Sequence, residues 1–206
     1  MTIQQNTDVQ RRSDINFDTV LHTLRALVPD RHVSHLESLH IAEQQADLLR
    51  DILHITTDTF PVDLIEKIPF VSITPVHELP VSGIAFWGDH TWKIHIRAEE
   101  PLSRRRLNTL HEFKHVIDHP NLGRLYDGRP HVAAGERELV ADHFAACVLM
   151  PADQLRRASL ETVDRCTLAG RFHVDHTQLG HRLDDLDLTP IAPEQLSIYV
   201  TERRIT

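Results

Sequence analysis

The segment His111-Glu112-Phe113-Lys114-His115 has the residue types and the spacing of a metal site with an adjacent general base. On an α-helix, residues four apart project from one face, so the imidazoles of His111 and His115 can bind one metal ion. Glu112 lies one position further round the helix, facing the open side of the metal. Zinc held by neutral nitrogen ligands lowers the pKa of bound water from about 15.7 to about 7, and a neighbouring carboxylate can take the proton as the water attacks a carbonyl. The motif indicates metal-assisted peptide hydrolysis with Glu112 as the catalytic base.

The residues around the motif predict the helix that it requires. Ser103 is the predicted N-cap after Pro101, and no Gly or Pro interrupts residues 104–118. Pro120 ends the predicted helix. Apolar residues recur at helical spacing along it, at Leu107, Leu110, Phe113 and Ile117. The motif therefore lies in the middle of a helix with an apolar stripe beside it.

A third ligand is expected from a second predicted helix, which runs from Gly135 to a stop near Pro151. Glu138 is the predicted ligand, and Glu136 is its rival on a different side of the same helix. Asp142, one turn beyond Glu138, is predicted to accept the outward N–H of a ligand histidine and so fix its tautomer.

Two other features of this region bear on the same site. His119 is rejected as a ligand because it lies about 12 Å along the helix from His111, at roughly 1.5 Å per residue. The predicted loop of residues 121–135 contains Tyr126 and His131, which are the candidates for stabilising the oxyanion that forms during hydrolysis.

The two predicted helices carry a longer pattern, namely His111-Glu112-x-x-His115-x-x-x-His119, Glu138-x-x-x-Asp142 and Phe144-Ala145-Ala146-x-x-Leu149-Met150-Pro151. This pattern resembles the ImmA/IrrE family of metallopeptidases. The resemblance extends upstream to Ser82-Gly83-Ile84 and downstream to residues 168–186, and it covers about three quarters of the chain. The chain departs from the family pattern at positions that are not predicted ligands: Arg97, Lys114 (where Gly is usual) and Val140.

The resemblance implies an α+β fold, with a zincin-like metallopeptidase core and a small antiparallel sheet followed by a helical helix-turn-helix-like segment. It implies zinc as the cofactor, with manganese as the alternative, and His111, His115 and Glu138 as the ligands. It further implies that the partner is a protein substrate, a specific helix-turn-helix transcriptional repressor whose cleavage releases stress or mobile-element genes.

Composition is consistent with an intracellular enzyme. The chain has 206 residues, of which 41% are hydrophobic, enough for one compact core with a small appended helical unit. Two cysteines, Cys147 and Cys166, do not make a disulfide framework and favour the reducing cytoplasm. We expect no membrane partner, because the polar residues 1–14 lack the apolar core of a signal peptide and no stretch approaches about 18 apolar residues. The formal charge of −8 makes direct nucleic-acid binding an unfavoured function.

Periodicity predicts the remaining elements: helices near residues 17–24, 36–52 and 61–68, a strand at 70–73, and a hairpin of residues 84–87 and 91–97 around Gly88-Asp89. The predicted organisation is a disordered N-terminus (1–14), a zincin-like domain (15–152) and a helix-turn-helix-like segment (153–206). A strand beside the metal-binding helix can hold an extended peptide by β-addition.

Two other functions compete with the peptidase. One is a DNA-binding regulator, but residues 164–187 contain three arginines against five aspartates, so the recognition helix is not basic. The other is an antitoxin-like interaction module with a non-catalytic metal site. The presence of Glu112 weakens that interpretation, because a structural metal site does not need a general base.

Overall fold

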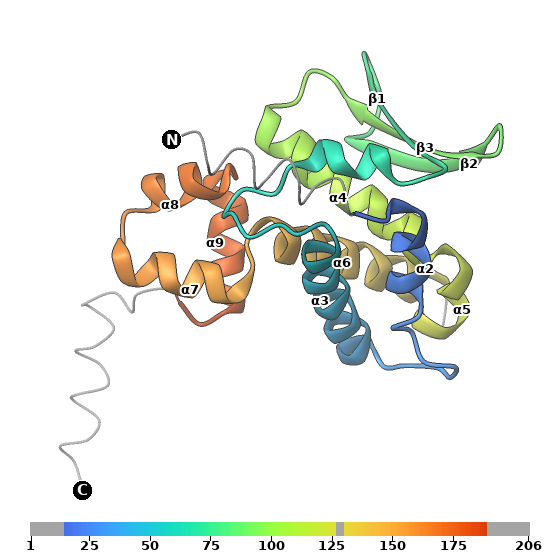
Figure 1. The fold of residues 1–206 in the computed structure, drawn as a ribbon, viewed down its shortest axis with the longest axis horizontal. Coiled ribbons are helices and arrows are strands. Elements are labelled where there is room, and N and C mark those ends of the chain that lie inside the picture. Colours follow the sequence, from blue (N-terminus) through green and yellow to red (C-terminus); the bar gives the residue numbers. More distant parts are fainter. Residues whose placement is uncertain (1–14, 127–129, 189–206) are drawn as a thin grey trace, which may run out of the picture.

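A computed structural model describes residues 15–126 and 130–188, without the side chains of Pro130 and His131 (Figure 1). The predicted N-terminal segment 1–14 and residues 189–206 lie outside this description. The helices are η1 (Phe17–Thr19), α2 (Val20–Arg25), α3 (His35–Ile52), η2 (Val62–Lys67), α4 (Leu102–Asp118), η3 (His119–Asn121), α5 (Leu122–Leu125), α6 (Pro130–Leu149), α7 (Ala152–Glu161), α8 (Arg165–Phe172) and α9 (His176–Asp185). The strands are β1 (Val71–Val76), β2 (Gly83–Gly88) and β3 (Thr91–Arg97). This is the α+β fold that the sequence predicts.

The three strands form a sheet in the order β1-β3-β2. Strands β2 and β3 pair antiparallel, and the turn residues Asp89 and His90 have φ angles of 50° and 59°. Two consecutive positive φ angles are typical of a type I′ turn, whose twist matches that of the flanking strands. The predicted hairpin is therefore confirmed. The sheet as a whole is mixed, because β3 lies between the other two strands and runs parallel to β1.

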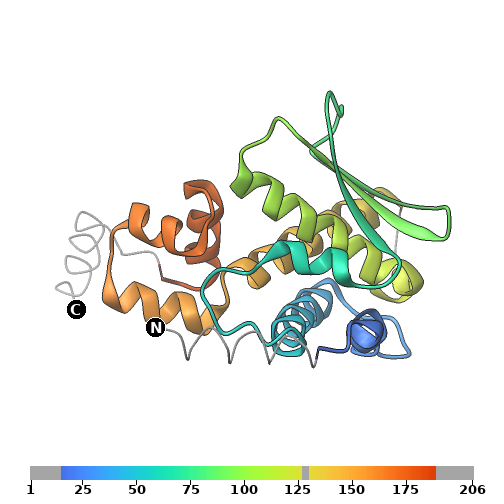
Figure 2. The ribbon, with the colours of Figure 1, turned by 45° about the horizontal axis from the view of Figure 1, so that its top comes forward.

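Helix α4 lies at the centre of the fold, with the sheet on one side and α6 and α3 on the other (Figures 1 and 2). Three residues of its apolar stripe, Leu110, Phe113 and Ile117, are 0% exposed, and the fourth, Leu107, is partly buried. Strand β3 contributes Ile94 and Ile96 to the same core. The predicted metal-binding helix is thus held on both sides by packing, which fixes the directions of the histidines on its remaining face.

Both helices of the motif begin earlier than the sequence predicts. Helix α4 starts at Leu102 with Pro101 as N-cap, so the prediction of Ser103 as N-cap is wrong. Helix α6 starts at Pro130 rather than at Gly135. Proline suits the first helical position, because its missing N–H would have no partner there and its φ is already helical. With η3 and α5, most of the predicted loop of residues 121–135 is helical.

Helices α7, α8 and α9 form a helical unit beside the end of α6 (Figure 1). The carboxylates of Asp164 and Asp175 accept hydrogen bonds from backbone N–H groups in the first turns of α8 and α9. Arg182 of α9 is 1% exposed and donates from Nε to the carbonyl of Met150. A buried hydrogen bond therefore joins this unit to the end of α6. The domain boundary between residues 152 and 153 stays a prediction.

None of the helices in the described ranges combines the length and the apolar character that crossing a bilayer requires.

Candidate metal centre

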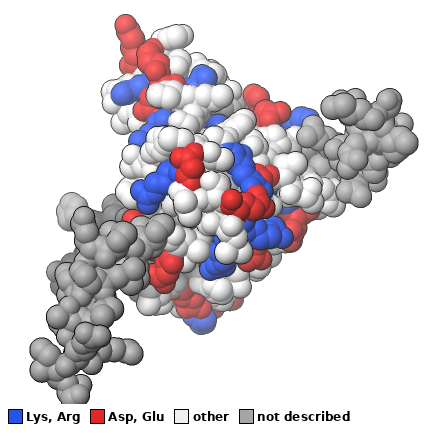
Figure 3. All heavy atoms as spheres, turned by 90° about the vertical axis from the view of Figure 1, so that its left-hand side faces the viewer, with Lys and Arg blue, Asp and Glu red and all other residues white. Residues whose placement is uncertain are grey.

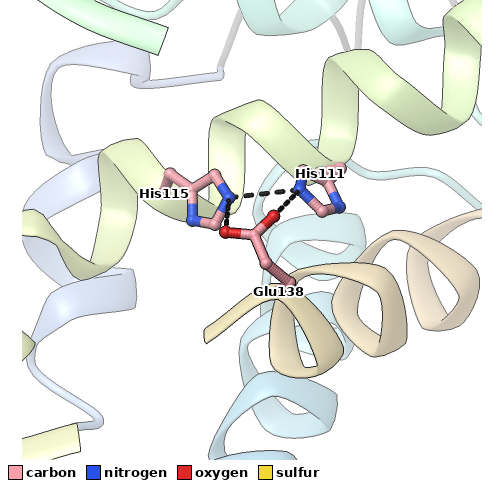
Figure 4. A group of neighbouring side chains, drawn as sticks. All are labelled: His111, His115 and Glu138. Atoms are coloured by element: carbon pink, nitrogen blue, oxygen red, sulfur yellow. Dashed lines mark hydrogen bonds and ion pairs between the residues drawn. The ribbon is translucent and has the colours of Figure 1, made fainter. Parts of the chain in front are cut away.

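His111 and His115 of α4 and Glu138 of α6 point toward one another (Figure 4). The Nε2 atoms of the two histidines lie 3.1 Å apart. Nε2 of His111 is 3.1 Å from Oε2 of Glu138, and Nε2 of His115 is 3.5 Å from Oε1. Within the described ranges, this is the group of three side chains whose potential ligand atoms all lie within 4.8 Å of one another. The structure thus brings together the three residues predicted as ligands.

The nitrogen and oxygen atoms of the three side chains are spaced as the ligands of one zinc ion would be, with a different oxygen of Glu138 next to each histidine. With zinc–ligand bonds of roughly 2.0–2.1 Å, two ligands at the tetrahedral angle lie about 3.3 Å apart. The three distances, 3.1, 3.1 and 3.5 Å, scatter around that value. Two imidazoles and one carboxylate are also the donor set of catalytic zinc sites, which keep a fourth position for water. The residues present therefore fit the metal.

Asp142 orients the ring of His111. Its Oδ1 atom lies 2.8 Å from Nδ1 of His111. Because an ionised carboxylate only accepts hydrogen bonds, Nδ1 donates and the lone pair of Nε2 is left for the metal. Burial opposes protonation of His111, but the carboxylates of Asp142, Glu112 and Glu138 together outweigh it and raise the pKa of His111. Asp142 thus lies where the sequence predicts the orienting carboxylate.

His115 is kept neutral by its surroundings. Burial, together with the neighbouring His111, lowers the pKa of His115 to about 4. The ring is therefore unprotonated at neutral pH, as a metal ligand must be. Its other nitrogen, Nδ1, is buried without a hydrogen-bond partner among the described residues. Of the two histidines, His111 is the one with a carboxylate that fixes its tautomer.

The carboxylate of Glu112 is buried beside the ligands and faces β2. Glu112 is 8% exposed and accepts a hydrogen bond from the backbone of Ala85. Glycine at position 83 allows this approach, because a methyl group there would lie 2.9 Å from Cγ of Glu112. Burial raises the pKa of Glu112, and the nearby Glu138 adds to this effect. A raised pKa makes a carboxylate a better proton acceptor near neutral pH, as a general base requires.

A cavity of about 280 Å³, the metal-side cavity, opens next to Glu112. It is lined by Gly83, Ile84, Ala85, Trp92, Glu112, His115, His119, Leu122, Arg137 and Glu138. The cavity therefore extends between the edge strand β2 and the part of α4 that carries the second histidine. It can admit part of a polypeptide to the side of the metal centre where Glu112 lies.

Two residues that the sequence analysis did not assign to the site line this cavity. Nε of Arg137 lies 3.6 Å from Oε1 of Glu138. This Nε has no hydrogen-bond partner among the described residues. His119, correctly excluded from the ligand group, places its ring edge-on to Trp92 with 4.8 Å between centroids. Their closeness in sequence to predicted ligands could have identified them, because Arg137 precedes Glu138 and His119 lies one turn beyond His115.

Of the two predicted oxyanion donors, Tyr126 is the one whose side chain the structure describes, and it does not line the cavity. The hydroxyl of Tyr126 donates to Oδ2 of Asp118 at 2.5 Å, and the side chain is 8% exposed. Burial and the Asp118 carboxylate raise the pKa of Tyr126. Tyr126 therefore belongs to a buried network around Asp118 and is not among the described residues that line the cavity. His131 lies in the first turn of α6, and its side chain is outside the described residues.

That network, the buried polar cluster, consists of Gln45, Lys114, Asp118 and Tyr126. Nζ of Lys114 donates to Asp118 at 2.5 Å and to Oε1 of Gln45 at 2.7 Å. Lys114, Asp118 and Gln45 are all 0% exposed, and burial lowers the pKa of Lys114. A lysine at a position where glycine is usual is thus accommodated by acceptors from α3 and from its own helix.

The site combines two histidines four residues apart on one helix with a carboxylate from a second helix and a buried glutamate beside them. This combination defines the HExxH class of metallopeptidases. Residues 70–184 match the family model described as the IrrE N-terminal-like domain, a peptidase family. Since this match covers more than half of the 206 residues, the chain belongs to that metallopeptidase family. The resemblance to ImmA/IrrE peptidases is thereby confirmed.

A solved structure has a similar fold: a chain described as a Mycobacterium tuberculosis transcriptional regulator, with a TM-score of 0.53 and 16% sequence identity. The match covers 78% of this chain and 50% of that one, so this chain spans about half the length of that structure. At this identity the comparison concerns the fold alone. A comparison with curated proteins finds no match.

Proposed function

We propose that this protein is a zinc-dependent endopeptidase that cleaves a specific intracellular protein. The observation that carries the proposal is the buried Glu112, held between β2 and the three convergent side chains of His111, His115 and Glu138. A metal site that only stabilised the fold would not need an acidic group with a raised pKa beside it. Membership of a metallopeptidase family supports the same function.

His111, His115 and Glu138 would hold the metal. Bound zinc supplies a Lewis acid for the substrate carbonyl and a water molecule that ionises near neutral pH. Asp142 keeps the ring of His111 in the ligating tautomer, and burial keeps His115 neutral. Glu112 accepts the proton from the attacking water at its carboxylate and then donates it to the leaving amine.

Arg137 is the residue best placed to stabilise the oxyanion. Among the described residues that line the metal-side cavity, it carries the one permanent positive charge. Its guanidinium lies beside the ligand carboxylate of Glu138 and has an unused N–H donor. A fixed cation next to the carbonyl under attack stabilises negative charge that develops on its oxygen. Arg137 thus takes the role for which the sequence suggested Tyr126 and His131.

For the substrate we propose a helix-turn-helix transcriptional repressor, cleaved within an extended or locally unfolded segment. Family resemblance suggests this class of partner. The position of β2 at the edge of the sheet, beside the metal-side cavity, favours a substrate in strand conformation. Cleavage of a repressor would release the genes that it controls, such as stress-response genes.

The test compares the wild type with Glu112→Gln and His115→Ala. We expect wild type and Glu112→Gln to bind one zinc ion per chain, because the ligands are intact, and His115→Ala to bind it far more weakly. With a repressor encoded by a neighbouring gene as substrate, Glu112→Gln should cleave about 10²–10⁴-fold more slowly than wild type. Zinc analysis and mass spectrometry of the fragments give the two readings. Undiminished cleavage by Glu112→Gln, or equal zinc in all three proteins, would overturn the proposal.

A further inference from the structure

A second cavity, larger than the metal-side cavity, lies on the other side of the ligands. This α9 groove has a volume of about 550 Å³ and lies between α3, α4, α6 and the helical unit, whose helix α9 forms one wall. Its apolar floor consists of Leu39, Leu107, Leu139 and Ala146. Leu139 is 58% exposed, although it follows directly after the ligand Glu138. The groove thus offers an apolar surface within one residue of the metal site.

Polar atoms without partners line the same groove. Gln178 of α9 is only 6% exposed, and its Nε2 atom has no hydrogen-bond partner among the described residues. Its other side-chain atom is occupied, because Oε1 accepts a hydrogen bond from the backbone N–H of Asp175. Nδ1 of His35, which also lines the groove, is likewise buried and unpartnered within the described chain. Buried polar groups normally have partners, so both atoms point to a ligand with hydrogen-bonding groups.

The two cavities lie along one face of α4. Arg104 and Leu107 line the α9 groove, and Glu112, His115 and His119 line the metal-side cavity, with His111 between them. From residue 104 to residue 119 the helix extends roughly 22 Å at about 1.5 Å per residue. An extended polypeptide of about six or seven residues spans that length at roughly 3.3 Å per residue. The metal ligands would therefore lie near the middle of one continuous cleft.

The charges of the helical unit do not favour nucleic acid as its ligand. Arg171 bonds to Asp58 and Glu161, and Arg182 is buried against the carbonyl of Met150. On the face of the molecule that bears this unit, acidic and basic side chains are interspersed (Figure 3). A phosphate backbone requires a basic stripe, whereas a polypeptide needs apolar contacts and backbone hydrogen bonds. The α9 groove provides apolar contacts and hydrogen-bonding groups, so it is suited to a polypeptide.

We infer that the α9 groove is a subsite of the peptidase cleft, and that it binds a large apolar side chain of the substrate close to the bond that is cut. In this arrangement Nε2 of Gln178 donates to a backbone carbonyl of the substrate, while the leucine floor contacts the side chain. The helical unit is then a substrate-recognition element, and specificity depends on α9 as well as on the metal-binding helices. This inference rests on the proposed endopeptidase function.

The first experiment measures binding without cleavage. In zinc-loaded full-length Glu112→Gln protein, a photoreactive benzophenone amino acid replaces His181, which lines the groove, or His176, which does not. The probe is a mixture of peptides from a trypsin-digested cell lysate. We expect crosslinked peptides, enriched in large apolar residues, from position 181 and not from position 176. Adding Gln178→Glu should reduce the yield about tenfold, because it removes the donor and retains a capping-box residue at this position.

The second experiment measures cleavage specificity with the same peptide mixture. Thr177→Trp fills the groove, and His176→Trp adds the same ring at the neighbouring exposed position outside it. We expect the wild type and His176→Trp to favour a large apolar residue at one position near the cut. In Thr177→Trp the preference for large over small apolar residues there should fall by about tenfold or more.

The outcomes separate the two ideas. The subsite proposal is overturned if Thr177→Trp has the same cleavage-site preference as an active wild type, or if positions 176 and 181 crosslink equally. Neither outcome contradicts the proposed endopeptidase function. Crosslinking at position 181, without cleavage of the peptides or of the repressor by the wild type, supports the groove as a peptide-binding site and overturns the endopeptidase.

Discussion

Gly83 is the residue on which the position of Glu112 depends most directly. A methyl group at this position would lie 2.9 Å from Cγ and 3.0 Å from Oε1 of Glu112. These contacts are too close, so Gly83→Ala should displace the carboxylate while the ligands keep their places. We expect roughly normal zinc content and a loss of about 10²-fold in cleavage rate, which is the scale at which general-base catalysis fails.

Gly88→Ala, at the other end of the same strand, is the matched control. A methyl group there would meet its nearest side-chain atom at 3.7 Å, an ordinary contact, so Gly88→Ala should cleave at the wild-type rate. Zinc content and initial cleavage rate are measured for both alanine variants and the wild type. Equal rates for the two alanine variants would show that Glu112 does not need the space at position 83.

Arg137 gives a second prediction at a single residue. If its guanidinium stabilises the oxyanion, Arg137→Gln should lower kcat by about 10²–10³ with little change in KM, as removal of one oxyanion donor does. Arg137→Lys should recover part of the loss, because it keeps the charge. A rise in KM at constant kcat would instead assign Arg137 to ground-state binding of the substrate.

Individual residues of the site were predictable when the chemistry and the local spacing both restricted them. His111 and His115 share a helix, so four residues of spacing were enough to place them together. Glu138 and Asp142 could be placed by the same spacing on a second helix. Arg137 could not, because its importance depends on which part of α6 faces the metal-side cavity. Tyr126 was assigned to the wrong environment because its partner Asp118 lies on the buried side of α4.

At the scale of the element, α4 has two polar faces with different tasks. One carries the histidines, and the other carries Lys114, which belongs to the buried polar cluster. Lys114→Met should destabilise the metal-free protein by roughly 3–5 kcal/mol, because it leaves the fully buried carboxylate of Asp118 without its cation. Urea unfolding of the metal-free proteins measures the difference.

The double variant Lys114→Met/Asp118→Leu is the control for that experiment. It removes both charges, so it should be clearly more stable than Lys114→Met alone. If the two variants unfold at the same urea concentration, the ion pair is not what the fold depends on at this position.

Element boundaries show which local signals were informative. The hairpin was predictable because two strand-like runs flank a short turn, and α3 because its apolar stripe is long. The starts of α4 and α6 differ from the prediction, since Pro101 is the N-cap of α4 and Pro130 is the first residue of α6, where its fixed φ suits the helix. The parallel pairing of β1 with β3 depends on contacts between distant segments, which no local pattern contains.

For the molecule as a whole, the two cysteines report on the integrity of the core. Cys166 is exposed, whereas Cys147 is 1% exposed in α6, and burial raises the pKa of Cys147 to about 12. At pH 8 its thiolate population is negligible, so a thiol reagent should modify one cysteine rapidly in the native protein and two in urea. Cys166→Ser should abolish the rapid phase. Rapid modification of both thiols in the native wild type would contradict this packing.

Helix α6 provides both the carboxylate of Glu138 and the Asp142 side chain that aligns His111. A slide of α6 along its axis by one residue, about 1.5 Å, would therefore remove one ligand and misalign another in a single movement. Both contacts therefore depend on the position of this one helix. Loss of the metal and loss of the correctly aligned histidine should thus occur together, so that the centre switches between two states rather than weakening by degrees.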